Sequence, residues 1–65
     1  MLRFHVPNMT CGGCARSVTK ALQSVDAAAR IDTDPARHEI RIETSVDESV
    51  LQTALEKAGY PATRL

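Results

Sequence analysis

The chain has 65 residues, with eight Lys and Arg residues against eight Asp and Glu residues, so its formal net charge is zero. Domains usually hold about 100–200 residues, and a chain of this size buries only about 60% of the surface that its unfolded form exposes. We therefore expect residues 1–65 to form a single domain that lacks the deep, dry pocket of an enzyme. Zero net charge also excludes the strongly basic surface of a typical nucleic-acid-binding protein.

Residues 2–25 predict a strand followed by a helix. Apolar and polar side chains alternate at the N-terminus, as in a strand with one buried face, and Pro7 ends this strand. The apolar residues of the strand are Leu2, Phe4 and Val6. Further along, apolar residues recur at the spacing of one helix face, at Ala15, Val18, Leu22 and Val25. Thr10 is expected to cap the N-terminus of this helix.

A hairpin is expected next. Its first strand is predicted from the alternating residues Ala27, Ala29 and Ile31. The segment from Asp34 to Arg37 contains a proline and is predicted to form the turn between the two strands. Ile40 and Ile42 then alternate with charged residues and predict the second strand.

A second amphipathic helix and a short strand complete the chain. Ser45 and Glu48 have the spacing of a capping box, in which the glutamate reaches back to the cap. The apolar face of the helix is predicted to contain Val50, Leu51, Ala54, Leu55 and Ala58. Gly59 stands where helices commonly end in a left-handed residue, and residues 61–65 leave room for one edge strand that starts with a proline.

The order strand, helix, strand, strand, helix, strand indicates one α+β fold. With right-handed crossovers it gives a ferredoxin-like βαββαβ sandwich, in which two helices cover one face of a four-stranded antiparallel sheet. This topology brings residues 7–14, 34–38 and 59–61 to the same end of the molecule.

Two cysteines, Cys11 and Cys14, lie at the predicted start of the first helix and are the candidate metal ligands. Residues three apart share a helix face, so their sulfurs can converge on one ion, and a helix N-terminus stabilises thiolates. Soft thiolates favour Cu(I), whereas structural zinc normally takes four protein ligands. Residues 1–25 contain no Asp or Glu that could complete a site for a harder ion. We therefore predict that the pair binds a monovalent soft ion, with Cu(I) as the first candidate.

The sequence MTCGGC at residues 9–14 resembles the M-x-C-x-x-C signature of heavy-metal-associated (HMA) domains. The order of elements and the segment Ala58–Tyr60 match this family as well. HMA domains occur as small copper chaperones and as N-terminal modules of copper-transporting P-type ATPases. The resemblance implies a ferredoxin-like fold with Cu(I) bound by Cys11 and Cys14.

The resemblance also implies positions for three neighbours of the cysteines. Met9 is expected to turn inward and pack beneath the loop, with a thioether ligand to copper as the alternative. Tyr60 is typical of bacterial chaperones and is expected beside the metal, either shielding the thiolates or packing as a half-buried aromatic residue. Asn8 stands where the family commonly has glycine.

The ends of the chain resemble a free-standing chaperone, because Met1 and Leu65 coincide with the ends of the expected fold. The N-terminus contains Arg3 and His5 and so lacks the apolar core of a signal peptide. We expect a cytoplasmic protein, not an enzyme, that passes copper by thiolate exchange to the metal-binding domain of a copper-transporting P-type ATPase or to a copper-responsive regulator. We expect neither binding to nucleic acid nor insertion into a membrane. A copper-bridged homodimer is an additional assembly that this site allows.

Several alternatives stay open at this stage. Other thiophilic ions (Ag, Hg, Cd or Zn) fit the same pair, and a dithiol oxidoreductase is the alternative from the enzyme class. Arg16 and Lys20 either steer docking onto an acidic partner or form a solvated helix face. His5 is expected on the exposed sheet face, and His38 is either an extra ligand or a turn residue at the cysteine end. RNA binding is disfavoured because residues 38–43 offer no aromatic side chain for base stacking.

Overall fold

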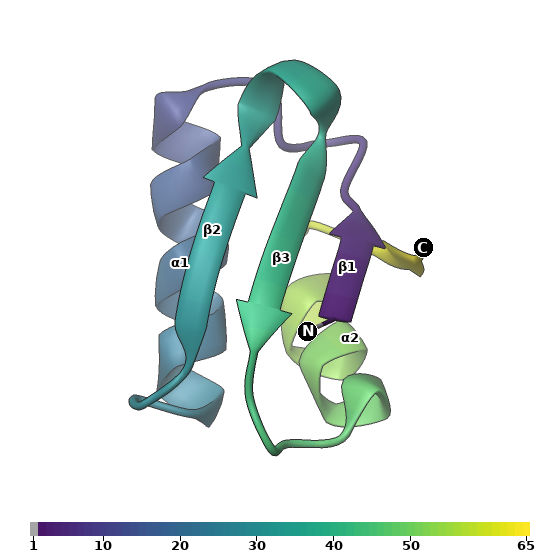
Figure 1. The fold of residues 1–65 in the computed structure, drawn as a ribbon. Helices are drawn as coiled ribbons and strands as arrows, with labels where there is room; N and C mark the ends of the chain where they lie inside the picture. The colour runs from purple at the N-terminus through teal and green to yellow at the C-terminus, as the bar shows by residue number, and fades with distance from the viewer. Residues whose placement is uncertain (1) are drawn as a thin grey trace.

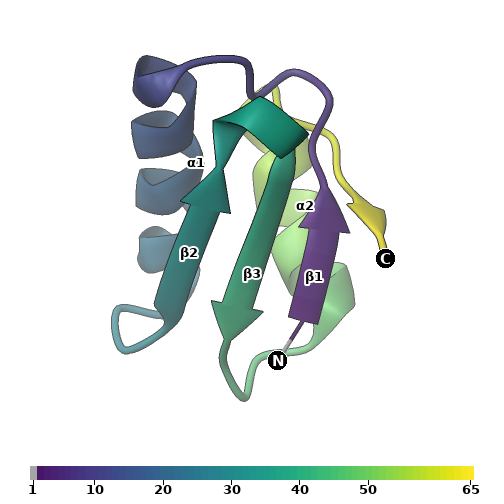
Figure 2. The ribbon, with the colours of Figure 1, turned by 45° about the horizontal axis from the view of Figure 1, so that its top comes forward.

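The elements follow one another in the predicted order in the computed structural model, which describes residues 2–65 (Figure 1). They are β1 (Leu2–His5), α1 (Gly12–Val25), β2 (Arg30–Asp34), the 3-10 helix η1 (Pro35–Arg37), β3 (Glu39–Glu43), α2 (Glu48–Lys57) and β4 (Thr63–Arg64). Both helices lie on one face of the sheet, as Figures 1 and 2 show, so the predicted ferredoxin-like fold is confirmed. Neither helix within residues 2–65 is long and apolar enough to cross a membrane.

The sheet has the strand order β2-β3-β1-β4, and every neighbouring pair is antiparallel. In the central pair of strands Phe4 lies opposite Ile40 and Leu2 lies opposite Ile42. Since side chains alternate along a strand, these apolar residues all face the helices. β4 is two residues long and lies at an edge, which agrees with the predicted edge strand.

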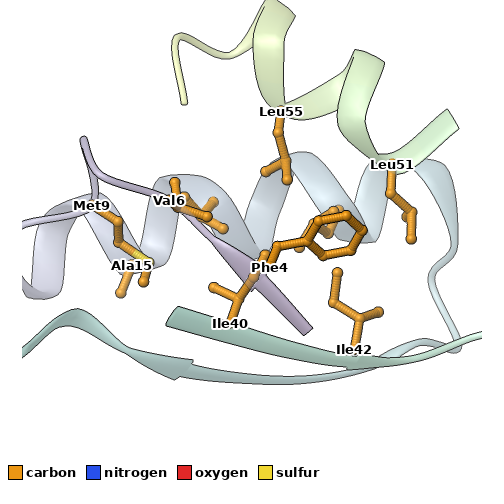
Figure 3. Close-up of a cluster of buried hydrophobic side chains, with 10 residues drawn as sticks. Phe4, Val6, Met9, Ala15, Ile40, Ile42, Leu51 and Leu55 are labelled. Carbon is orange, nitrogen blue, oxygen red and sulfur yellow. The ribbon is translucent and has the colours of Figure 1, made fainter. Parts of the chain in front are cut away.

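The hydrophobic core lies between the sheet and the helices, where Figure 3 shows side chains from both layers meeting. Each large side chain buried in this way stabilises the fold by about 1.5–3 kcal/mol relative to an exposed one. Met9 is fully buried and enters the cluster from the loop after β1, so its predicted inward orientation is confirmed. The buried residues are Phe4, Val6, Met9, Ala15, Val18, Leu22, Ile40, Ile42, Leu51 and Leu55.

The predicted cap of α1 is wrong, because the helix begins at Gly12 and its N-cap is Cys11 rather than Thr10. Cys11 has an extended backbone, and its side chain makes no capping hydrogen bond to the backbone of the helix. Its carbonyl accepts the N–H of Ala15 at 3.0 Å and so starts the helical pattern one residue later than a threonine cap requires. The first turn of α1 therefore contains both glycines and Cys14.

The predicted capping box of α2 is also wrong. Asp47, not Ser45, is the N-cap. The carboxylate of Glu48 does not reach back to the cap, because it accepts a hydrogen bond from Arg64 Nη1 at 2.8 Å. Val50, predicted on the buried face of this helix, is 47% exposed, so the face that packs on the core is narrower than expected.

β2 begins at Arg30, three residues later than the alanine pattern predicts. Asp26 follows α1, and its carboxylate accepts the Ala28 N–H at 3.0 Å while its carbonyl accepts the Ala29 N–H at 3.1 Å. These two bonds form a tight turn, in which Ala27 and Ala28 are exposed. The alanine pattern is compatible with such a turn as well as with a strand. The hydrogen bonds of Asp26 stabilise the turn here.

Gly59 has the left-handed conformation predicted for it, with φ of 87°. The N–H groups of Gly59 and Tyr60 donate to the carbonyls of Glu56 and Leu55 at 3.0 and 2.8 Å. This is the hydrogen-bond pattern of a Schellman motif. The motif fixes the direction in which the chain leaves α2, and with it the position of Tyr60.

We expect Gly59→Ala to lower the free energy of unfolding by about 1–2 kcal/mol, since a side chain at positive φ crowds its own carbonyl. Gly12→Ala is the matched control, because it lies in α1 with open space where its Cβ would be. There alanine is expected to raise the free energy of unfolding by about 0.4–1 kcal/mol. Urea denaturation measures both changes, and equal effects at the two positions would contradict the role assigned to Gly59.

Candidate metal centre

The loop that carries the cysteines begins with a tight turn. The N–H of Met9 donates to the carbonyl of Val6 at 3.0 Å, and Pro7 supplies the φ that the second position of such a turn favours. Because the Met9 side chain is buried, it anchors the end of the turn in the core. Beyond Met9 the chain returns to the surface, where Thr10 and Cys11 are exposed.

The two sulfurs lie 3.3 Å apart, with the Cys11 thiol donating to Cys14 Sγ. Both thiols are free; Cys11 is exposed, whereas Cys14 is half-buried against the core. Two sulfurs bound to one ion at about 2.3 Å each lie at most about 4.6 Å apart, so the thiols must separate by about an ångström to hold an ion in line. Cys11 can supply this movement, because its side chain is exposed.

Cys14 is the more acidic position, with its pKa lowered from the ordinary 9.0 to about 6. The backbone N–H of Thr10 contributes most to this shift, followed by the Cys11 thiol and the Tyr60 hydroxyl. Each of these groups donates toward the sulfur and so stabilises its charged form. At neutral pH Cys14 is therefore a thiolate, which is the form that binds metal ions.

Tyr60 lies beside Cys14, as the family resemblance implies. Its pKa is raised because its hydroxyl donates to the Cys14 sulfur and because the negative charge there opposes a second one. The ring is half-buried and packs against the core. Both roles considered from the sequence therefore apply, since the ring packs while the hydroxyl faces the thiolate.

Two other loops hold the cysteine loop in place. Asn8 Nδ2 donates to the carbonyl of Gly59 at 3.3 Å, which ties the cysteine loop to the end of α2. From the other side, His38 Nδ1 lies 3.0 Å from the carbonyl of Met9, and the His38 carbonyl accepts the N–H of Val6 at 2.6 Å. The predicted meeting of three loops at one end of the molecule is confirmed and can be followed at the top of Figure 2.

The two histidines occupy positions away from the sulfurs. His5 is half-buried rather than exposed, and its ring lies edge-on to that of His38 with centroids 6.1 Å apart. Nδ1 of His38 is engaged by the Met9 carbonyl. Within residues 2–65 no group of three or more His, Cys, Asp or Glu side chains is placed to hold a metal ion. His38 thus has a hydrogen-bonding role in this structure instead of joining the cysteine pair as a third ligand.

Three contributors to the site were not predicted: the backbone of Thr10, the amide of Asn8 and the ring of His38. A backbone N–H belongs to every residue except proline, so the composition of the loop carries no signal for the role of Thr10. Asn8 and His38 act across segments that are distant in the chain. The only signal for them was the topology, which places their loops at the cysteine end.

Comparison with known proteins agrees with this geometry. The sequence profile of the heavy-metal-associated domain matches residues 3–61. The crystal structure of a gold binding protein has a TM-score of 0.97 and 42% identity, and the alignment covers 100% of both chains. The copper chaperone Atx1 from Synechocystis PCC6803 has a TM-score of 0.93 and 35% identity over 97% of this chain and 100% of that one. The chain therefore belongs to the heavy-metal-associated domain family.

Curated relatives are longer proteins. The mercuric transport protein periplasmic component of Pseudomonas fluorescens is 36% identical over 65 residues, which cover 92% of this chain and 69% of that protein. The match spans 15% of heavy metal-associated isoprenylated plant protein 35 from Arabidopsis thaliana. It spans 7% of copper-transporting ATPase 2 from Rhizobium meliloti (strain 1021), with 34% identity and 88% of this chain covered. This family is thus found both in small metal-handling proteins and within larger ones.

We expect Cys14 of the reduced, metal-free protein to react with iodoacetamide with a pH midpoint of about 6. Its reactivity should persist at neutral pH and disappear as the pH falls through that value. Because the folded pKa lies below the ordinary 9.0, the thiolate stabilises the fold fully above pH 9.0 and loses this contribution as the pH falls through about 6.

Peptide mass spectrometry assigns the alkylated cysteine. Cys11→Ala removes one donor and should raise the midpoint of Cys14, whereas Cys11→Ser keeps a hydroxyl donor and should raise it less. A wild-type midpoint near the ordinary 9.0 would contradict the stabilisation described for this thiolate.

Proposed function

We propose that residues 1–65 form one heavy-metal-associated domain that acts as a cytoplasmic copper chaperone. Cys11 and Cys14 bind Cu(I), and the ion passes to a partner by thiolate exchange, without any reaction on a substrate. The observation that carries this proposal is the pair of free thiols 3.3 Å apart, one exposed and the other held as a thiolate.

Cu(I) suits this site better than a harder ion. Two soft sulfur ligands with no third His, Cys, Asp or Glu nearby, within residues 2–65, favour a monovalent ion of low coordination number. The likeness to a copper chaperone supports copper, and the likeness to a gold binding protein supports a second candidate, carriage of another thiophilic ion on the same pair. Both candidates use the same ligands and the same exchange chemistry.

The two cysteines have different parts in the exchange. An incoming thiolate of the partner binds the ion while both cysteines still hold it. Cys11 leaves first, because it is exposed and open to the incoming thiolate. Cys14 leaves last, because it is half-buried against the core and is harder to reach. No free ion is released at any step.

The surface beside the cysteines favours an acidic partner. Arg16 and Lys20 are exposed on α1, one turn apart, and line a groove that begins at Gly12. Residues 2–25 contain no acidic side chain to offset them. We propose that this surface docks on the metal-binding domain of a copper-transporting P-type ATPase or on a copper-responsive regulator. Without a partner, the exposed Cys11 allows a copper-bridged homodimer.

The reduced protein should bind about one Cu(I) per chain in anaerobic competition against a chromogenic chelator. Cys11→Ser and Cys14→Ser should each weaken binding by more than about 100-fold, which is the upper end of the loss seen for groups that only support a ligand. Met9→Leu is the matched control: the packed methionine is replaced by a residue of similar volume without sulfur, so the affinity should not change.

Unchanged affinity in Cys11→Ser would disprove the proposed site, and weakened binding in Met9→Leu would make Met9 a ligand. Parallel titrations with Ag(I), Au(I), Hg(II), Cd(II) and Zn(II) identify the preferred ion. Turnover in an insulin reduction assay would instead support a dithiol oxidoreductase.

Charge reversal of Arg16 and Lys20 to Glu should slow Cu(I) transfer to an ATPase metal-binding domain by about tenfold at low ionic strength, with a smaller effect in high salt. Affinity for Cu(I) should stay the same, because neither residue is among the groups that stabilise the Cys14 thiolate. Reversal of Arg30 and Arg41 on the sheet makes the same change in net charge and is the control. Equal slowing by both pairs would show that net charge, rather than this surface, controls the transfer rate.

A further inference from the structure

His38 is fixed in an unusual conformation next to the cysteine loop. It is the one non-glycine residue at positive φ within residues 2–65, with φ of 54°, and its N–H donates to the carbonyl of Pro35 at 3.2 Å. Its own carbonyl accepts the N–H of Val6 at 2.6 Å, which ties it to the end of β1. The backbone thus holds the imidazole in a defined place above the turn that leads to the cysteines.

The ring reaches one particular atom of that turn. His38 Nδ1 lies 3.0 Å from the carbonyl oxygen of Met9. A carbonyl oxygen can only accept, so Nδ1 must carry the hydrogen and donate it. Of the two neutral tautomers of the ring, the contact selects the one with its hydrogen on Nδ1.

The accepting carbonyl belongs to the same peptide unit as the N–H of Thr10. A trans peptide is planar, so its C=O and N–H point in opposite directions, and a bond that fixes one also fixes the other. The His38 ring thus holds one edge of the Met9–Thr10 peptide and sets the direction in which the Thr10 N–H leaves the opposite edge.

Within residues 2–65 the Met9 carbonyl has no hydrogen-bond donor other than His38. Met9 is held by its buried side chain and by its N–H, which donates to Val6 at 3.0 Å, but neither contact sets the rotation of the peptide that follows. Thr10 is exposed. A hydrogen bond to the carbonyl also polarises the peptide and makes its N–H a stronger donor.

We propose that His38 is a positioning residue of the metal site, whose ring N–H holds the Met9 carbonyl and with it the Met9–Thr10 peptide of the loop that leads to Cys11. This rests on the proposed function insofar as it assigns Cys14 as a ligand. Groups that orient ligands in this way change metal affinity by about 10–100-fold when removed, although they never touch the metal.

His38→Gly tests the proposal, because glycine accepts positive φ and keeps both backbone bonds while the ring is lost. His5→Ala is the matched control, since it removes the ring that lies edge-on to His38 and leaves the Met9 carbonyl untouched. In reduced, metal-free protein, His38→Gly should shift the Thr10 amide proton resonance upfield and speed its exchange with solvent. Cu(I) affinity should fall about tenfold. His5→Ala should change neither the Thr10 amide proton nor the affinity for Cu(I).

The outcomes separate this inference from the proposed function. Failure of the wild-type protein to bind Cu(I) would refute the proposed function. The Thr10 amide proton would still show whether the His38 ring holds the Met9–Thr10 peptide. An unchanged Thr10 amide in His38→Gly, or an equal change in His5→Ala, would overturn the positioning role. The imidazole nitrogen spectrum of the wild-type protein needs no variant: a hydrogen on Nδ1 supports the role, and a hydrogen on Nε2 alone overturns it.

Discussion

The burial of Met9 is the constraint on which the metal site depends. Its side chain is fully enclosed by the core, and it belongs to the short loop between β1 and α1. Because that point of the loop is anchored, the two residues that follow must return to the surface, and Cys11 becomes the exposed N-cap of α1. Cys14, three residues on, then faces back toward the core. The core thus sets the positions of both sulfurs although neither belongs to it.

The site stabilises negative charge with neutral groups. The Thr10 N–H, the Cys11 thiol and the Tyr60 hydroxyl all act on the Cys14 sulfur, and no cationic side chain is among them. Neutral donors can favour the thiolate without drawing anions into the site, and of the three only the Cys11 thiol must give up its hydrogen to bind a metal ion. Arg16 and Lys20 remain on the exposed face of α1, where they are available to a partner. Thiolate stabilisation and partner docking are therefore carried by different residues.

The sequence predicted well those features that burial decides. Alternation around Phe4 and Ile40 correctly predicted strands, and the spacing of Val18 and Leu22 correctly predicted a helix. These residues are all buried in the one hydrophobic core of the domain, so their pattern also predicted the core. The cysteine pair and the inward Met9 were predicted from a local motif. These features depend on residue type and spacing, which a sequence displays directly.

The caps and the supporting contacts were missed because several partners compete for the same polar group. Glu48 could bond its own helix or Arg64, and it bonds Arg64. The Asp26 carboxylate closes a turn over Ala28 and thereby moves the start of β2. The contacts of His38 depend on a backbone conformation set by the η1 turn and on a loop far away in the chain. Only three-dimensional proximity selects among such partners.

The difference between the two sulfurs gives the proposed exchange a direction. An exposed Cys11 can be approached by a partner thiolate, whereas Cys14 is half-buried and packs against the core. Opening of the first turn at Cys11 removes the Cys11 thiol from Cys14. The Tyr60 hydroxyl stays beside Cys14, because it comes from the loop after α2.

This asymmetry also bears on the choice of ion. Two thiolates alone bind any thiophilic metal, so the pair itself does not discriminate among copper, gold and mercury. The groups around the thiolates, in contrast, respond to the charge that the bound ion leaves on the sulfur. A Thr10 N–H and a Tyr60 hydroxyl aimed at one sulfur favour an ion that leaves negative charge on that sulfur, as a monovalent ion does on a dithiolate. A divalent ion neutralises both thiolates and gains less from the same donors, which is why the proposed function takes a monovalent ion as cargo.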